Sequence, residues 1–420
     1  MSHQPLACQA LERRVLLAFF NVPGTDGDDQ ISVAINGPNV VANVNGVITT
    51  APDADVTGIL INGFAGNDTF VIESNSDNAT TVNGGLGNDA VFLAPTSQRV
   101  ADITAFVMVN GDDGFDSLSI SDVNGSAGVN YQITGAVIGR SNGPSMLPRV
   151  EGFSLMAGPG DDFVEMSRAG PNLVNAGPGT DTIDIRETGS SVMTLTPSTG
   201  DDIVGVNTDD VTVSRLDLVA QRLGSLTIHI GGVVRLLADG AQRVLTTSSL
   251  SLTGSAVFDV ADNHMIIDYT GPSPLAAIQA ALTSGYAGGA WNGTGINSAA
   301  AAAQGNTALG YAEATDLFAT FPAPFLGQSV DDTSILVRYT LYGDHDLNGT
   351  VNLGDFNRLA SNFGQTNRRW SQGDSDYNGT VDLNDFNRLA ANFGGTASAA
   401  PTADATITRS PLRELVDSLR

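Results

Sequence analysis

Two twelve-residue segments near the C-terminus place oxygen-bearing side chains at matching intervals. The first runs from Asp344 to Asp355, and the second, thirty residues later, runs from Asp374 to Asp385. Each has oxygen side chains at positions 1, 3, 5, 9 and 12, a glycine for a sharp turn at position 6, and a backbone carbonyl available at position 7. Hard cations such as Ca²⁺ are bound by oxygen ligands with this spacing. The predicted Ca²⁺ ligands are Asp344, Asp346, Asn348, Thr350, Asn352 and Asp355 in the first loop, and Asp374, Asp376, Asn378, Thr380, Asp382 and Asp385 in the second.

The two segments are copies of one unit that continues into a helix. Residues 344–364 and 374–394 are identical at 16 of 21 positions, so the shared spacing is not a chance match. Phe356, Leu359 and Phe363 follow the first loop at i, i+3 and i+7, which predicts a helix over 355–363 with one apolar stripe. The same pattern predicts a helix over 385–393. Such a small unit has a thin core, so we expect bound metal to supply much of its stability.

A duplicated EF-hand-like loop and helix without an entering helix resembles a type I dockerin, over roughly residues 343–395. The resemblance implies calcium binding and docking onto a cohesin domain of another protein. Recognition in that family is attributed to positions 10 and 11 of each loop, often Ser-Thr, whereas this chain has Leu353-Gly354 and Leu383-Asn384. The calcium ligands therefore carry over and the cohesin-contacting pair does not. We expect the partner to be either a cohesin-like protein or a cell-surface component.

The two loops differ in charge. Position 9 is Asn352 in the first loop and Asp382 in the second, so the loops hold three and four carboxylates, respectively. Because ligand charge tunes calcium affinity, the second loop is predicted to bind Ca²⁺ more tightly.

A Gly-Asp phrase recurs from residue 24 to about residue 204. One copy is 84–89, Gly-Gly-Leu-Gly-Asn-Asp. Each copy is followed by residues that alternate in character. After the copy at 63–68, for example, Phe70 and Ile72 are expected to point inward and Thr69 and Val71 outward. Glycine permits tight turns, and the alternation predicts half-buried strands. One strand and turn cannot bury an apolar face alone, so the copies are expected to stack into a solenoid.

The phrase resembles the Gly-Gly-x-Gly-x-Asp-x-apolar nonapeptide of RTX-type (haemolysin-type) calcium-binding repeats. In that family, tandem copies form a β-roll around Ca²⁺. The copies in this chain are never tandem at nine residues, which favours a right-handed β-helix or an irregular β-sandwich over a β-roll. Two interpretations of the Asp residues remain open: turns that need no metal, and weaker calcium sites at Asp68, Asp89, Asp162 and Asp181.

The composition narrows the function classes. The chain has 38 Asp against seven Glu, its 19 basic residues are all Arg, and its formal net charge is -26. Asp suits turns and cation loops. Without a basic stripe to neutralise phosphates, nucleic-acid binding is disfavoured. The single Cys8 rules out a disulfide framework, and no apolar run approaches the roughly 18 residues of a membrane span.

Residues 223–342 combine short strands with helix signals. Ser273 and Pro274 predict the start of a helix over Leu275–Leu282, and Asn297 or Ser298 is expected to cap a second helix over 299–303. The segment from 266 to 342 resembles the module that precedes dockerin-type repeats in bacterial surface proteins. Tyr286 and Trp291 form either a carbohydrate-stacking platform or part of an aromatic core.

The N-terminal segment also bears a resemblance. Residues 11–17, Leu-Glu-Arg-Arg-Val-Leu-Leu, resemble the Leu-Glu-Pro-Arg-x-Leu-Leu leader of many large bacterial surface proteins, with Arg13 in place of Pro. The resemblance implies export, and therefore an extracellular or cell-surface location.

We therefore expect a mainly β chain with five segments. They are a leader or export segment (1–20), a β-helix or solenoid of degenerate Gly-Asp repeats (21–222), a mixed linking module (223–342), a small α-helical dockerin-like EF-hand pair (343–395) and a flexible tail (396–420). The expected function is that of a non-catalytic extracellular calcium-binding surface or matrix protein. The alternative is a β-helix polysaccharide-degrading hydrolase or lyase that carries a dockerin. A polysaccharide is then the expected ligand, and Arg186 and Arg215 are the candidate catalytic residues.

Overall fold

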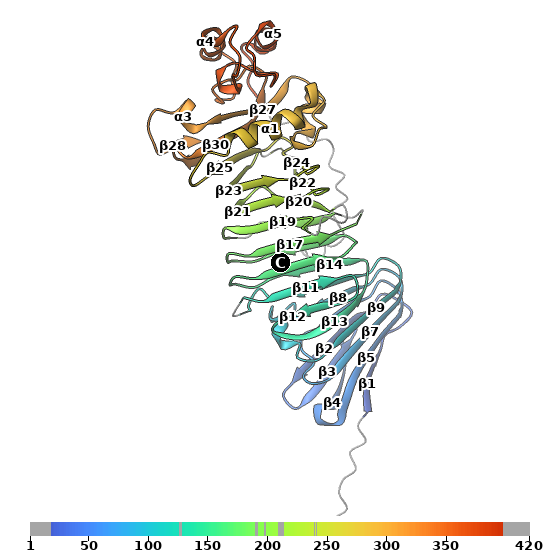
Figure 1. Cartoon of the computed structure of the whole chain (residues 1–420). Coiled ribbons are helices and arrows are strands. Elements are labelled where there is room, and N and C mark those ends of the chain that lie inside the picture. The colour runs from blue at the N-terminus through green and yellow to red at the C-terminus, as the bar shows by residue number, and fades with distance from the viewer. Residues whose placement is uncertain are drawn as a thin grey trace, which may run out of the picture.

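The computed structural model describes residues 18–397 apart from 126–127, 190–191, 197–198, 209–213, 239 and 241. With 46% strand and 15% helix, the chain is mainly β, as predicted. It is elongated, with the first strands at one end and the last helices at the other (Figure 1). The predicted leader up to residue 17, which includes Cys8, and the predicted tail from residue 398 onward lie outside the described residues.

Nearly all described strands belong to two long, open sheets. The first sheet has the order β1 (Ala18–Pro23), β5 (Val56–Ala65), β7 (Ala79–Leu86), β9 (Val107–Asp113), β13 (Gly143–Arg149), β12 (Ile138–Arg140), β11 (Asn130–Thr134), β15 (Phe163–Ser167), β17 (Thr182–Glu187), β19 (Asp202–Val206), β21 (Arg222–Ile228), β23 (Val244–Leu252), β25 (His264–Asp268), β30 (Ser334–Leu341) and β27 (Thr307–Glu313). We call it the 15-stranded sheet.

The second, 13-stranded sheet faces the first. Its order is β26 (Gly295–Asn297), β24 (Val257–Asp259), β22 (Val233–Leu236), β20 (Arg215–Leu218), β18 (Met193–Leu195), β16 (Asn172–Asn175), β14 (Gly152–Met156), β10 (Ser117–Ser121), β8 (Ala90–Leu93), β6 (Thr69–Ile72), β2 (Gln30–Asn36), β3 (Asn39–Val44) and β4 (Val47–Pro52). A separate hairpin is formed by β28 (Ala323–Phe325) and β29 (Gln328–Val330).

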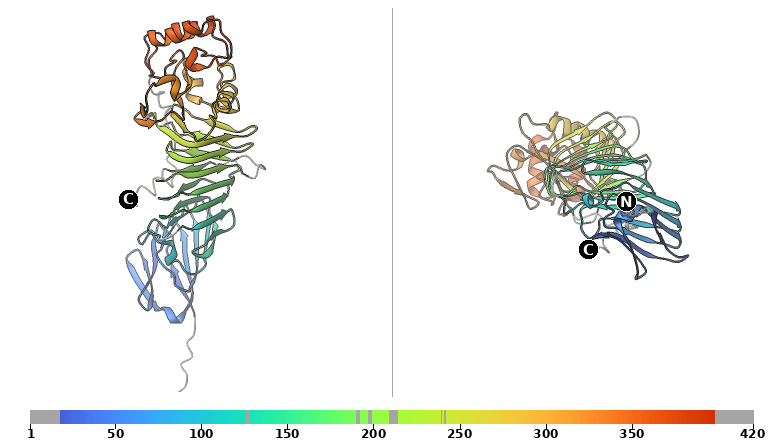
Figure 2. Two further views of the ribbon diagram at one scale, coloured as in Figure 1. Left: turned by 60° about the vertical axis from the view of Figure 1, so that its left-hand side comes forward. Right: turned by 90° about the horizontal axis from the view of Figure 1, so that it is seen from below.

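Successive strands alternate between the two sheets. From β7 to β10 and from β16 to β25, each strand pairs in parallel with the strand two places earlier in the chain. The strands therefore lie across the long axis, one above another (Figures 1 and 2). The boundary expected at 222/223 falls inside β21, and the parallel pairing continues beyond it to β26.

Inward-facing residues of successive strands form apolar columns between the sheets. Phe70 and Ile72 are fully buried whereas Thr69 and Val71 are half-buried, as the alternation predicted. In-register pairing places one fully buried aliphatic residue from each level in a single column, namely Ile72, Leu93, Ile120, Leu155, Val174, Leu195, Leu218 and Leu236. Each level therefore buries its apolar face against its neighbours, which explains why the repeat must be stacked.

The Asp residues of the Gly-Asp phrase form two hydrogen-bonded series, Asp29 to Asp116 and Asp162 to Asp202, which together we call the Asp column. In each link, Oδ1 of one Asp accepts the backbone N–H of the Asp one level earlier. The links are Asp29 N to Asp68 (2.8 Å), Asp68 N to Asp89 (2.8 Å), Asp89 N to Asp116 (2.8 Å), Asp162 N to Asp181 (2.8 Å) and Asp181 N to Asp202 (3.1 Å). These turns therefore have a structural explanation that requires no ion.

The glycine five residues before each of four of these Asp residues leaves room for the carboxylate. A Cβ on Gly84 would lie 2.1 Å from Asp89 Oδ2 and 2.7 Å from the carbonyl oxygen of Gly111. Gly63 stands in the same relation to Asp68. Since no side chain fits at these distances, the spacing of Gly and Asp in the phrase follows from packing.

We predict that Gly84→Ala lowers the free energy of unfolding by about 2 kcal/mol or more, because the added methyl group meets backbone and a buried carboxylate. Gly135→Ala is the control, since a Cβ there meets nothing within 4 Å. Urea unfolding followed by circular dichroism measures both variants. Equal stabilities of the two variants would contradict the packing explanation.

In five Asp residues of the column, the second carboxylate oxygen is buried without a hydrogen-bond partner. This holds for Oδ2 of Asp68, Asp89, Asp116, Asp162 and Asp181. Burial, reinforced by the charges of neighbouring Asp residues, raises the pKa of Asp89 to about 6 and that of Asp181 to about 7. Asp89 and Asp181 therefore take up protons at a mildly acidic to neutral pH.

This proton uptake predicts an unusual pH dependence of stability. A carboxyl group with a higher pKa in the folded chain contributes stability that is fully present below about pH 4 and is lost as the pH rises through 6 to 7. Asp181→Asn keeps an oxygen for the N–H of Asp162 and removes the buried charge. We expect this variant to be more stable than the parent at pH 8, by roughly 1 kcal/mol or more, and equally stable at about pH 3.5, below the ordinary pKa of Asp. Urea unfolding at the two pH values tests this, and a variant as pH-dependent as its parent would contradict it.

The described helices gather towards the C-terminal end (Figure 1). They are α1 (Leu275–Tyr286), α2 (Ala299–Gln304), α3 (Ala314–Leu317), α4 (Leu353–Asn362) and α5 (Leu383–Asn392), with short 3₁₀ turns η1 (Asp53–Asp55), η2 (Val100–Asp102), η3 (Ala287–Gly289) and η4 (Trp370–Gln372). The expected helix over 275–282 continues to Tyr286. Ser298 caps α2 by accepting the N–H of Ala301, as predicted. Among the described helices, none combines the length and apolarity needed to cross a membrane.

Candidate metal centre

Each predicted calcium loop brings three carboxylates together. Side-chain oxygens of Asp344, Asp346 and Asp355 lie within 4.8 Å of one another, and those of Asp374, Asp376 and Asp385 do the same. In both groups the first and last residues are buried and the middle one is half-buried. These residues occupy positions 1, 3 and 12 of each loop, so both clusters could hold a metal ion.

The position-12 carboxylate joins the start of each loop to the helix that follows. Asp355 accepts N–H groups from His345 (2.8 Å), Asp346 (3.1 Å) and Asn352 (2.9 Å). Asp385 accepts the equivalent three bonds, from Ser375 (2.7 Å), Asp376 (3.2 Å) and Asp382 (2.8 Å). The same network in both copies means that the cluster geometry is a property of the loop sequence.

The residues at position 9 of the two loops are the N-caps of the helices that follow. The side chains of Asn352 and Asp382 cap α4 and α5, each accepting an N–H group at 2.7 Å, and each completes a capping box with the Asp at position 12. Neither belongs to the three-carboxylate groups. The extra charge of the second loop therefore acts from the helix start, close to the cluster.

The remaining predicted ligands shape the turn. Asn348 Oδ1 accepts the N–H of Thr350 at 2.8 Å, and Asn378 Oδ1 accepts that of Thr380 at 2.7 Å. Gly349 has a φ of 90°, in the left-handed region that a side chain rarely adopts, as expected for position 6.

The electrostatics of both clusters favour a cation. Burial raises the pKa of Asp344 and of Asp374 to about 7, and the neighbouring carboxylate at position 12 adds to the rise. Oδ1 of Asp374 is buried without a hydrogen-bond partner. A divalent ion would relieve the repulsion and supply that missing partner. The donors are all oxygens, which suits hard cations such as Ca²⁺ and Mg²⁺.

The apolar stripes of the two helices are only partly buried. Leu359 and Leu389 are buried in a small core with Leu341, Val351 and Val381, whereas Phe363 and Phe393 are exposed. The helices end at Asn362 and Asn392, so each Phe follows the last helical turn and lies beyond the small core.

The weaker predicted calcium ligands are Asp68, Asp89, Asp162 and Asp181. They lie at separate levels of the Asp column, and within the described residues the acidic clusters that could hold a metal are the two in the C-terminal loops. Calcium at these turns stays a prediction.

The two arginines considered for catalysis lie in different sheets. Arg186, in β17, is ion-paired with Glu165 (2.9 Å) and Asp184 (3.1 Å). Arg215 starts β20 in the other sheet. The chain nevertheless brings their backbones close together, since Ser214 donates to the carbonyl oxygen of Arg186 at 3.0 Å and the N–H of Arg215 donates to Thr188 Oγ1 at 2.9 Å.

Tyr286 and Trp291 belong to the core. Both are buried, and their ring centroids lie 5.2 Å apart in an edge-on arrangement. This excludes the carbohydrate-stacking platform, which needs exposed ring faces.

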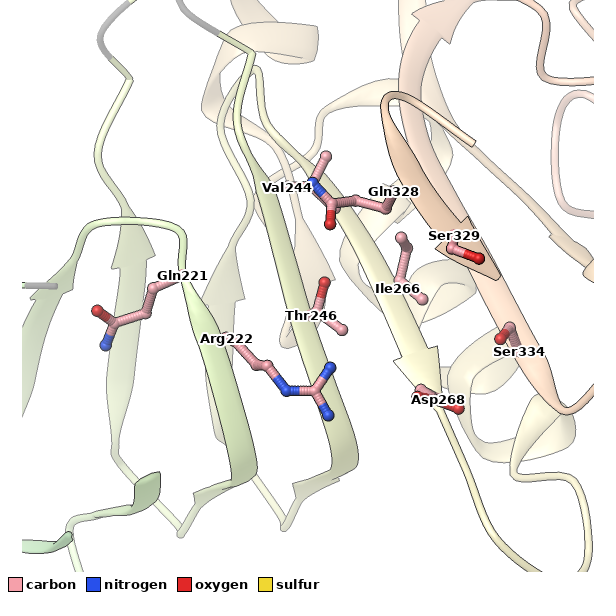
Figure 3. Close-up of a pocket in the computed structure, with 9 residues that line it drawn as sticks. All are labelled: Gln221, Arg222, Val244, Thr246, Ile266, Asp268, Gln328, Ser329 and Ser334. Atoms are coloured by element: carbon pink, nitrogen blue, oxygen red, sulfur yellow. The ribbon is translucent and has the colours of Figure 1, made fainter. Parts of the chain in front are cut away.

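A polar crevice, which the sequence analysis did not find, lies between the 15-stranded sheet and the hairpin β28–β29 (Figure 3). Its volume is about 280 Å³. Arg222 extends across the sheet towards Thr246 and Asp268 (Figure 3), and its Nε is ion-paired with Asp201 at 2.5 Å. The lining comes from several strands and the hairpin, so sequence spacing carried no signal for it.

Comparison of the chain with protein-family models, with curated proteins and with solved structures finds no match. The two acidic clusters and their surroundings are therefore the features of the chain that bear on its function.

The clusters predict the outcome of substitutions at position 12. Asp385→Asn should remove one of two calcium-binding events in calorimetry. The amide carries no negative charge, and it cannot accept all three N–H bonds that the carboxylate of Asp385 accepts. Asp26→Asn, at an exposed residue of the first repeat, is the control and should leave both events unchanged. Two unchanged events in Asp385→Asn would contradict the assignment of the second site.

The charge difference between the loops gives a second prediction. Asn352→Asp retains the oxygen that caps α4 and adds a negative charge next to the first cluster. We expect calorimetry to show tighter Ca²⁺ binding at the first site, since ligand charge tunes affinity. An unchanged affinity would mean that position 9 acts only on the helix.

Proposed function

We propose that this chain is a non-catalytic extracellular calcium-binding protein of a cell surface or matrix, with two Ca²⁺ sites at one end of a long β spacer. The observation that carries the proposal is the duplicated cluster of three carboxylates, held by the same backbone bonds in both loops. Flexible twelve-residue loops with many oxygen donors favour Ca²⁺ over Mg²⁺, which requires a tighter octahedral site.

We interpret the two alternating sheets as a β-solenoid of the right-handed β-helix type. The parallel pairing between successive levels, the aliphatic columns and the Asp column support this interpretation. Parallel crossovers are almost always right-handed. In this proposal the solenoid is a stiff spacer that separates the calcium unit, residues 343–395, from the N-terminal end.

The calcium unit offers a surface for a protein partner. Leu353 and Leu383 are 62% and 61% exposed, and Phe363 and Phe393 are 53% and 56% exposed. They are equivalent residues of the two copies, so the surface is duplicated. Exposed large apolar side chains often mark interaction sites. The dockerin resemblance points to a cohesin-like protein or a cell-surface component as the partner.

The alternative is a polysaccharide-degrading hydrolase or lyase. The polar crevice in Figure 3 is the feature that would take a sugar, whereas the guanidinium of Arg186 is already ion-paired with Glu165 and Asp184. Release of reducing or unsaturated ends from acidic and neutral polysaccharides would establish the alternative.

The test of the proposed function is a calcium titration of the full chain after chelation. We expect two Ca²⁺ ions per chain by calorimetry, and a double variant Asp355→Asn, Asp385→Asn that binds none with comparable affinity. A parent chain that takes up no Ca²⁺, or a double variant that binds as the parent does, would overturn the proposal.

A further inference from the structure

The two calcium loops pack into the linking module, residues 223–342, which we call the β module. The fourth residue of each loop, Leu347 in the first and Tyr377 in the second, is buried in the main core of the molecule. Both have positive φ angles, 58° and 60°. Non-glycine residues rarely adopt this conformation. In both copies it directs an apolar side chain away from the acidic cluster and into the β module.

Tyr377 links the second loop to edge strand β27. Its hydroxyl donates to the carbonyl oxygen of Leu309 in β27 at 2.8 Å. Its ring lies 4.7 Å from that of Tyr286, 5.7 Å from that of Trp291 and 5.6 Å from that of Trp370, between centroids. The second loop therefore completes an aromatic cluster whose other members include residues of the β module.

The first loop is held by strand β30 and by the segment between the loops. Arg338 Nη1 donates to the carbonyl oxygen of Leu347 at 2.6 Å, and Thr340 donates to a carboxylate oxygen of Asp344. Trp370 Nε1 donates to the carbonyl oxygen of Asp344 at 2.6 Å. A predicted calcium ligand is thus bonded directly to β30 and to Trp370.

Strand β27 is the last strand of the 15-stranded sheet and pairs with β30 on one side only. The calcium unit packs closely against it: a Cβ on Gly310 would lie 2.6 Å from Trp370 Nε1 and 2.6 Å from Leu347 Cδ2. Six of its seven residues are buried. An uncovered edge strand with buried apolar residues would be a site for unwanted pairing, so such edges need cover.

We propose that Ca²⁺ bound in the two loops fastens the calcium unit over strand β27, so that calcium controls whether this edge of the sheet is covered. The inference rests on the proposed calcium function and adds an intramolecular role to it. Without the ion, the three carboxylates of each cluster repel one another, and the loops lose the conformation that places Leu347 and Tyr377 in the core. Because ion binding and docking are linked, weakening one weakens the other by the same factor.

Hydrogen exchange on the full chain, with Ca²⁺ or with EDTA, tests the proposal directly. We expect EDTA to speed amide exchange in β27 and around Trp370, and to leave β17 and β19 in the middle of the stack unchanged. Calorimetry on the same sample reports whether Ca²⁺ binds. Two bound ions with unchanged protection of β27 would overturn the fastening and leave the proposed function intact. No bound ion would overturn both.

Variants that keep every predicted ligand test the linkage from the other side. Leu347→Ala and Tyr377→Phe should each weaken Ca²⁺ binding, by about fivefold or more for Leu347→Ala. The matched control is Leu86→Ala, an exposed leucine of β7 outside the calcium unit, which should bind as the parent does. Tyr377→Phe removes only the hydroxyl bond to Leu309, so it stays informative if Leu347→Ala fails to fold. Parent-like affinity in Tyr377→Phe, with or without a folded Leu347→Ala, would overturn the linkage.

Discussion

A buried carboxylate that accepts backbone N–H groups is the interaction on which most of this structure depends. In the stack, Oδ1 of Asp89 holds the N–H of Asp68 one level away, and in the loops Asp355 and Asp385 hold the loop entrance. Burying a charge is costly unless it is bonded or paired. Single carboxylates in the column can meet this cost by taking up a proton. Three carboxylates together call for a cation, and this separates the structural use of Asp from its proposed use in calcium binding.

The stack of strands and the C-terminal end of the molecule are stabilised in different ways. The stack gains stability from repetition, because each level buries its apolar residues against the next. Its C-terminal end has no further level to pair with, and the chain instead folds the calcium unit onto β27 through Tyr377, Trp370 and Leu347. The calcium unit is therefore continuous with the core of the β module on one face. It also carries the exposed Leu and Phe residues proposed to meet a partner.

The net charge of -26 takes on a physical meaning in this arrangement. Part of the Asp content lies in the column, where burial raises the pKa of Asp181 to about 7. Another part lies in the two clusters, where the proposed ions would neutralise it. The chain therefore has fewer uncompensated charges under the conditions proposed for it than its composition indicates, which lowers the self-repulsion of the folded state.

The sequence by itself determined the features that depend on neighbours along the chain. The spacing of Asp344, Asp346 and Asp355 is enough to bring them together, because a short loop and the first turn of a helix place them. Strand alternation and the cap at Ser298 are local in the same way. Only the tertiary structure decided that Gly84 leaves room for Asp89 beside the next level of the stack, and that Phe363 lies outside the core. It also decided that Tyr377 bonds to Leu309, 68 residues away. These outcomes depend on the register between strands and on which modules pack together, and no local pattern of residue types encodes either.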